Sequence, residues 1–117
     1  MSFIHGKILI SAEAESFSVG TAYIYLENTS CADAPAEVLA KTSIKNIKHD
    51  PGQLKQQTVI PFHLNFDEKL INFKNIYSLR VWIDTDGSGK QSLNDLYSDE
   101  FYPVLTRGSG DYAEIRV

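Results

Sequence analysis

The chain has 117 residues, of which 43% are hydrophobic, and a formal net charge of −4 at pH 7. This length and composition suit one domain with one hydrophobic core, spanning residues 1–117. The 6 Phe, 6 Tyr and 1 Trp exclude a low-complexity disordered chain. The acidic balance argues against nucleic acid as a partner, because phosphate binding requires a basic face. No run approaches the roughly 18 apolar residues of a membrane span, so none is expected.

The ends of the chain and its single cysteine carry little chemistry. Met1-Ser2-Phe3 leads directly into strand-like sequence, without the basic and apolar segments of a signal peptide. As it stands, this start predicts a cytoplasmic protein. Cys31 is the only cysteine and cannot form an internal disulfide, so the fold must be stabilised by its core. We interpret Cys31 as a bystander.

Alternation of apolar and polar residues recurs along the whole chain and predicts β-strands. Each predicted strand has one apolar face, as in antiparallel sheets that are buried on one side. Two such sheets packed face to face form a β-sandwich. We therefore predict an all-β, immunoglobulin- or transthyretin-like antiparallel β-sandwich of about seven strands. In chain order the predicted strands are residues 4–10, 22–27, 38–45, 60–66, 77–83, 101–105 and 112–117.

The connections contain several local signals. Pro61 cannot donate a ladder hydrogen bond, so its strand is expected at a sheet edge or with a bulge. Asp50-Pro51-Gly52 predicts a turn within a polar connection. Residues 67–75 are consistent with a helical turn. The Tyr77 hydroxyl is expected to bond back to nearby backbone, as at a Greek-key corner.

Residues 84–95 have the spacing of a calcium-binding loop. In a 12-residue loop of the EF-hand type, oxygens from positions 1, 3, 5, 7, 9 and 12 surround the ion, and position 6 is glycine. Gly89 occupies position 6, although Gln91 stands at position 8, where an apolar residue is more usual. Position 7 supplies a backbone carbonyl, so a lysine there can face water. The predicted ligands of one Ca²⁺ are Asp84, Asp86, Ser88, Lys90, Ser92 and Asp95.

A solvated hairpin connection is the alternative interpretation of the same loop, because Asp-Gly and Gly-Ser-Gly are ordinary turn sequences. Two points favour the metal site: the full set of ligand positions, and the repulsion of three converging carboxylates without a cation. Asp95 at position 12, in place of glutamate, resembles the calcium loops of dockerin domains. Asn94, Asp99 and Glu100 are alternative ligands if the loop has a different shape. A single loop outside a helix pair favours a stabilising role over a sensor role.

Motifs of catalysis are missing from the sequence. His5, His49 and His63 lie far apart, and there is no nucleophile elbow, His-Glu-x-x-His or phosphate-binding loop. The Asp99-Glu100 pair is more typical of a solvated strand entry than of a glycosidase dyad. We predict that the protein is not an enzyme. A deep pocket lined by His63 or Cys31 with convergent polar groups would reopen that alternative.

Four segments carry a similarity to a known family. Residues 27–36, Glu-Asn-Thr-Ser-Cys-Ala-Asp-Ala-Pro-Ala, are followed by Ile-Pro-Phe at 60–62, Tyr-Ser-Leu-Arg-Val at 77–81 and Tyr-Pro-Val-Leu-Thr-Arg-Gly at 102–108. In this order they resemble the YbaY/YscW family. The resemblance implies an immunoglobulin- or transthyretin-like sandwich. Its members are commonly periplasmic or outer-membrane-anchored lipoproteins, and one branch looks like the pilotins that help assemble type III secretion rings. The loop at 84–95 stands where a shorter hairpin is expected, so the resemblance does not imply calcium.

Two functional hypotheses follow. The first is a non-enzymatic β-sandwich binding module that holds one structural Ca²⁺ in the 84–95 loop. The alternative is a metal-free, pilotin- or chaperone-like protein-interaction domain of a bacterial envelope or secretion system. In that case an exposed sheet edge accepts a strand of a protein partner through main-chain hydrogen bonds. The sequence does not predict the oligomeric state.

Overall fold

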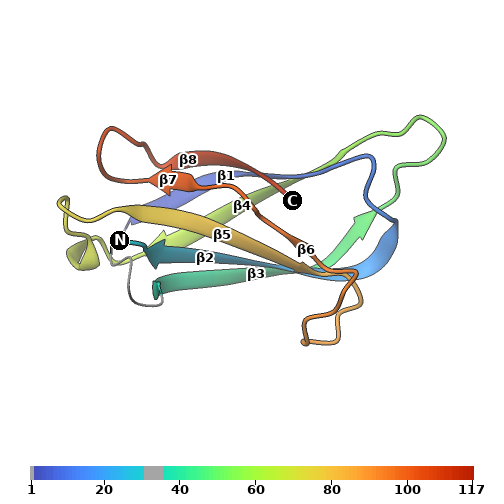
Figure 1. The fold of residues 1–117 in the computed structure, drawn as a ribbon, viewed down its shortest axis with the longest axis horizontal. Helices are drawn as coiled ribbons and strands as arrows, with labels where there is room; N and C mark the ends of the chain where they lie inside the picture. The colour runs from blue at the N-terminus through green and yellow to red at the C-terminus, as the bar shows by residue number, and fades with distance from the viewer. Residues whose placement is uncertain (1, 31–35) are drawn as a thin grey trace.

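A computed structural model describes residues 2–30 and 36–117, and within them the chain forms eight β-strands and one short 3₁₀ helix, η1, at Glu68–Leu70 (Figure 1). The strands are β1 Ser2–Ile10, β2 Phe17–Asn28, β3 Glu37–His49, β4 Thr58–Phe66, β5 Tyr77–Asp84, β6 Leu96–Tyr97, β7 Tyr102–Val104 and β8 Tyr112–Arg116. The all-β prediction is confirmed. The additional strand is β6, which at two residues is too short to show a period. Cys31 and the Ala-Asp-Ala-Pro sequence at 32–35 lie outside the described residues.

The strands form two sheets, one with the order β4-β1-β8 and the other with the order β3-β2-β5-β6, where β7 also pairs with β5 (Figure 1). The expectation of purely antiparallel sheets was wrong at one pair, because β1 and β8 run parallel, from His5↔Tyr112 to Leu9↔Arg116. Apolar alternation shows which face of a strand is buried, but it does not show which neighbour the strand pairs with or in which direction.

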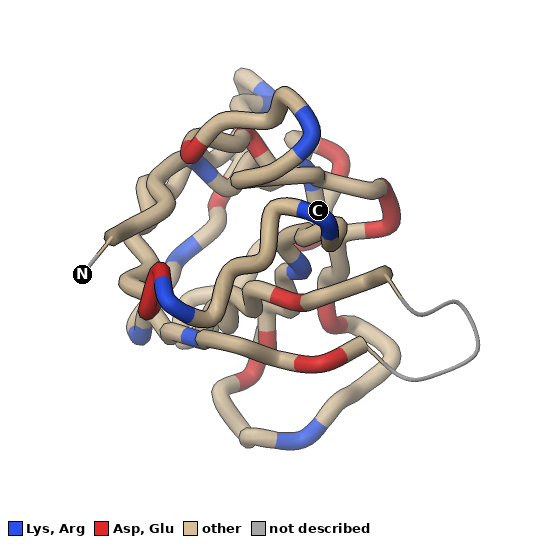
Figure 2. The backbone as a smooth tube through the Cα atoms, turned by 90° about the vertical axis from the view of Figure 1, so that its left-hand side faces the viewer, with Lys and Arg blue, Asp and Glu red and all other residues tan. Residues whose placement is uncertain are grey.

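The core lies between the two sheets and consists of the apolar faces of the alternating segments. Ile4, Ile24, Val81 and Ile115, from four different strands, are all fully buried. A continuous cluster of buried apolar side chains connects the sheets, so the predicted sandwich packing is confirmed. Among the residues that the structure describes, no helix is long and apolar enough to cross a bilayer. Figure 2 shows acidic and basic residues interspersed along the backbone in that view.

Two local predictions are confirmed around the β4–β5 connection. Pro61 lies in β4, which is an edge strand paired with β1. The buried Tyr77 hydroxyl accepts a hydrogen bond of 2.9 Å from the backbone N–H of Asn72. The expected helical turn is η1, and Asp67 caps it by accepting a 3.0 Å bond from the backbone N–H of Lys69.

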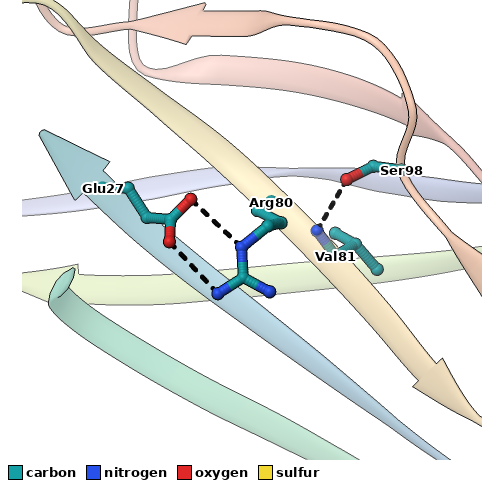
Figure 3. A network of polar contacts seen from close by, with 4 residues as sticks. All are labelled: Glu27, Arg80, Val81 and Ser98. Carbon is teal, nitrogen blue, oxygen red and sulfur yellow. Dashed lines mark hydrogen bonds and ion pairs between the residues drawn. The ribbon is translucent and has the colours of Figure 1, made fainter. Parts of the chain in front are cut away.

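The outer face of the larger sheet is held by polar and aromatic contacts between β2 and β5. Arg80 makes two 3.1 Å bonds to the carboxylate of Glu27 (Figure 3) and lies 4.2 Å from the ring centre of Tyr25. Beyond β6, the Ser98 hydroxyl accepts a 2.9 Å bond from the Val81 N–H (Figure 3). A side chain thus stands where a ladder carbonyl is usual, which explains why β6 ends after two residues.

Candidate metal centre

The candidate centre lies in the loop that joins β5 to β6, drawn in orange at the lower right of Figure 1. Asp84 is the last residue of β5 and is buried, whereas Asp86 through Ser92 are exposed. Asp95 is buried and directly precedes β6. The two strands pair in antiparallel register, with Ile83 opposite Leu96. Asp84 and Asp95 are the next residues toward the loop, so they lie close together where the two strands enter it.

Three of the six predicted ligands converge through their carboxylates. One oxygen each of Asp84, Asp86 and Asp95 lies within 4.8 Å of the others. Oxygens bound to one Ca²⁺ lie about 2.3–2.6 Å from the ion, so two ligands on opposite sides are separated by about 5 Å at most. The spacing of the three carboxylates thus suits a single ion. In the described part of the chain, Asp99 and Glu100 belong to no such group, so these alternatives are not supported.

The first half of the loop is shaped by its own side chains. The backbone N–H of Gly89 donates to Asp84 Oδ2 at 2.6 Å, and the N–H of Ser88 donates to Asp86 Oδ1 at 3.0 Å. Gly89 has a φ of +80°, a conformation that costs glycine little. The Ser88 hydroxyl lies 3.2 Å from the carbonyl oxygen of Lys90, so these two predicted ligand atoms also face the same turn.

The second half of the loop is held by Asp95. Its Oδ2 accepts bonds from Trp82 Nε1 at 2.8 Å and from the Ser92 N–H at 3.0 Å. Its Oδ1 accepts bonds from the Thr85 N–H at 3.1 Å, the Thr85 hydroxyl at 3.2 Å and the Ser92 hydroxyl at 3.0 Å. Ser92 was predicted as a position-9 ligand, whereas Trp82 and Thr85 were not predicted at all. The sequence signal that could have indicated the contact with Asp95 was Trp82, an outward-facing aromatic residue two positions before the loop.

Asp84 is the least satisfied member of the group. Its side chain is fully buried, and its Oδ1 finds no hydrogen-bond donor. Burial, and secondly the contact with the Asp86 carboxyl, raise the pKa of Asp84 above its ordinary value. The same contact, together with the Ser88 N–H, lowers the pKa of Asp86. A buried carboxylate oxygen without a donor is costly, and a bound cation would satisfy it.

Asp95 behaves differently, although it is also buried. Burial by itself favours its neutral form, but hydrogen bonds from Trp82, Thr85 and Ser92 outweigh this effect and lower the pKa of Asp95. Asp95 is therefore a carboxylate held in its charged form beside a second, unsatisfied one. The arrangement can bind a cation through oxygen ligands. Of the residues named for an enzymatic alternative, His63 is exposed and its Nε2 lies 2.8 Å from Asn65 Oδ1.

The sequence matches the type III secretion system lipoprotein chaperone family (YscW) over residues 4–117. The chain belongs to the YscW family. In structure, this YscW-family chain is similar to an alternative pilotin from the type II secretion system of Vibrio cholerae, with a TM-score of 0.76 and 25% identity. The similarity covers 98% of this chain and 93% of that chain. No curated protein sequence matches. The predicted family resemblance is confirmed, while calcium binding stays a prediction.

Proposed function

We propose that this chain is a non-enzymatic, protein-binding module of the chaperone or pilotin type, and that its 84–95 loop holds one structural Ca²⁺. The observation that carries the first part is the family match over residues 4–117, joined to structural similarity with a pilotin over 98% of the chain. The partner is a protein of a bacterial envelope secretion apparatus. The lipoprotein description of the family favours the envelope over the cytoplasmic location predicted from the start of the chain.

The outer edge of β3 is the surface that we assign to the partner. Among the described strands, β3 is the longest, with 13 residues, and pairs with β2 alone. Within the described residues no strand pairs with the other side of β3, so its backbone groups there can pair with an extended segment of another protein. Lys41, Lys45 and Lys48 lie exposed along this strand. These lysines discourage indiscriminate strand pairing and favour an acidic partner segment.

Cross-linking in the native host tests the first part. A tagged chain should recover a component of a secretion apparatus, identified by mass spectrometry. The double charge reversal K41E/K45E should reduce that recovery, whereas K7E/K69E, which reverses two exposed lysines outside β3, should not. Hydrogen exchange on the purified pair should show new protection within 37–49. Recovery without any envelope secretion protein would contradict the partner class, and protection confined to other strands would contradict the surface.

The calcium part rests on a separate observation. Asp84 Oδ1 is buried without a donor inside a group of three carboxylates, which is the condition that a cation relieves. Because the ion would join the ends of β5 and β6, its role in this proposal is structural. Removal of the metal should loosen the loop and leave the sandwich core folded.

A further inference from the structure

We infer that the 84–95 loop presents five protein oxygens to one Ca²⁺, and that Trp82 is the positioning residue for the fifth of them. This inference rests on the calcium part of the proposed function and names the ligands of that site. Two independent observations carry it. The first is the convergence of three carboxylates within 4.8 Å. The second is the fully buried Asp84 oxygen that has no donor.

Asp84 supplies the first ligand through Oδ1. Its other oxygen, Oδ2, is fixed by the 2.6 Å bond from the Gly89 N–H. The carboxylate therefore cannot turn to offer the other oxygen without losing that bond. A buried oxygen held in one orientation, with no donor of its own, is preorganised for a cation.

The next three ligands come from the turn that follows. Asp86 accepts the Ser88 N–H on Oδ1, which leaves its second oxygen for the ion. The Ser88 hydroxyl and the Lys90 carbonyl oxygen lie 3.2 Å apart, close enough to share one coordination sphere. On binding, the Ser88 hydroxyl proton turns away from Lys90, and both oxygens then face the ion.

Asp95 supplies the fifth ligand, and it supplies one oxygen rather than two. Each carboxylate oxygen accepts about two hydrogen bonds. On Oδ2 both positions are taken by N–H groups, from Trp82 and from Ser92. On Oδ1 the Thr85 N–H takes one position, and the other contacts come from hydroxyl groups, which can rotate. The Thr85 hydroxyl has the Asn94 carbonyl at 3.5 Å as another acceptor.

The resulting set fits Ca²⁺ in number and in charge. Five protein oxygens and one water on Ser92 reach six ligands, the lower end of the range for calcium. Three carboxylates carry three negative charges, so a divalent ion removes most of their mutual repulsion. Mg²⁺ suits the set less well, because it requires near-ideal octahedral geometry at about 2.0–2.1 Å and gives up its waters reluctantly.

Trp82 fixes the orientation of the Asp95 ligand. Its indole ring stacks on Tyr23 with centres 4.7 Å apart, and only 8% of the residue is exposed. The indole N–H therefore points at Oδ2 from a rigid ring, and it directs Oδ1 toward the ion. Loss of such an orienting partner typically weakens metal binding by about 10–100-fold.

Calorimetric titration of CaCl₂ into the full chain, freed of metal by a chelator, tests both statements. Wild type should bind one ion with a Kd on the order of 10⁻⁴–10⁻³ M, as in modest calcium sites. The variants Asp84→Asn and Asp86→Asn should show no binding heat. Trp82→Phe keeps the stacked ring and loses only the N–H donor, so it should bind about 10–100-fold more weakly. Asp99→Asn removes an exposed carboxylate outside the group and should match wild type.

The outcomes distinguish three claims: calcium binding itself, the assignment of the ligands, and the positioning role of Trp82. If wild type shows no heat at millimolar calcium, the calcium part of the proposed function fails and the ligand assignment fails with it, while the partner hypothesis stands. If wild type binds and Asp84→Asn binds equally well, the ligand assignment alone is wrong. Unchanged affinity in Trp82→Phe would overturn the positioning role. Circular dichroism of each variant shows whether lost binding reflects the site or unfolding. Ser88→Ala is a milder ligand variant and is subject to the same folding control.

Discussion

Trp82 donates a 2.8 Å hydrogen bond to Asp95 across 13 residues of sequence. The bond joins the far end of the acidic loop to the outer face of the larger sheet, where Trp82 stacks on Tyr23. Since the chain contains 1 Trp, tryptophan fluorescence reports on the surroundings of Trp82, which include Asp95 and Tyr23. A change in the Asp95 environment is therefore visible without any added label.

We expect calcium to change the emission of Trp82 and to raise the melting temperature. At 10 mM calcium, about 10–100 times the expected Kd, binding should stabilise the folded state by about 1.4–2.7 kcal/mol. For a domain of this size, that corresponds to an increase of about 5–10 °C. The measurement is thermal unfolding followed by fluorescence, with and without calcium, and EDTA should reverse both changes. A melting temperature that does not respond to millimolar calcium would contradict the structural role of the ion.

Asp84→Asn should stabilise the metal-free protein. The amide removes a buried charge and its repulsion from Asp86, while its oxygen still accepts the Gly89 N–H. We expect a gain of about 1 kcal/mol in the free energy of unfolding, measured by urea denaturation in EDTA. Asp84→Ala removes the acceptor as well and should lose about 1 kcal/mol instead. A destabilised Asp84→Asn in EDTA would mean that the carboxylate is satisfied without a cation.

Tyr77→Phe should destabilise the corner between η1 and β5. Tyr77 itself is only 1% exposed, and its hydroxyl is the 2.9 Å acceptor of the Asn72 N–H. The variant removes this acceptor and leaves the Asn72 N–H without its partner. The expected loss is about 1–2 kcal/mol in the free energy of unfolding. Tyr112→Phe, at a residue that is 45% exposed, is the matched control and should change stability by less than about 0.5 kcal/mol. Equal effects of the two variants would show that the corner bond contributes nothing.

The Tyr77 bond and the buried faces of the strands were predictable because both depend on local sequence. A corner tyrosine bonds within a few residues, and a period of two identifies the face that meets the core. The parallel pairing of β8 with β1 was not predictable in this way, since pairing joins the two ends of the chain. The two-residue strand β6 is defined by its register opposite Trp82 and Ile83, and not by any period of its own.

The candidate site shows the same division. Loop spacing alone predicted that Asp84, Asp86 and Asp95 converge, because position numbers in such a loop correspond to directions around one point. Spacing does not show which carboxylate oxygens already accept hydrogen bonds from other groups of the chain. Trp82 and Thr85 donate hydrogen bonds to Asp95 from outside the ligand pattern. Trp82 shares Oδ2 with the Ser92 N–H, so in the proposed site only Oδ1 is left to face the ion.

Gly6→Ala tests the parallel contact that the sequence did not predict. A Cβ at residue 6 would lie 1.8 Å from the carbonyl oxygen of Ala113 and 3.0 Å from the ring of Phe62. The first of these atoms belongs to the backbone, so either β1 or β8 must move. Because β1 is the central strand of its sheet, the movement also disturbs β4. We expect a loss of about 3 kcal/mol or more in the free energy of unfolding, measured by urea denaturation.

Gly110→Ala is the control for that measurement, because nothing lies within 4 Å of a Cβ built there and its φ is not in the left-handed region. It should change stability by about 0.5 kcal/mol or less. If the two variants are equally stable, Gly6 does not face Ala113 at the distance that the pairing of β1 with β8 requires. The parallel register would then be wrong, and with it the placement of β8 beside β1 that distinguishes this fold from a purely antiparallel sandwich.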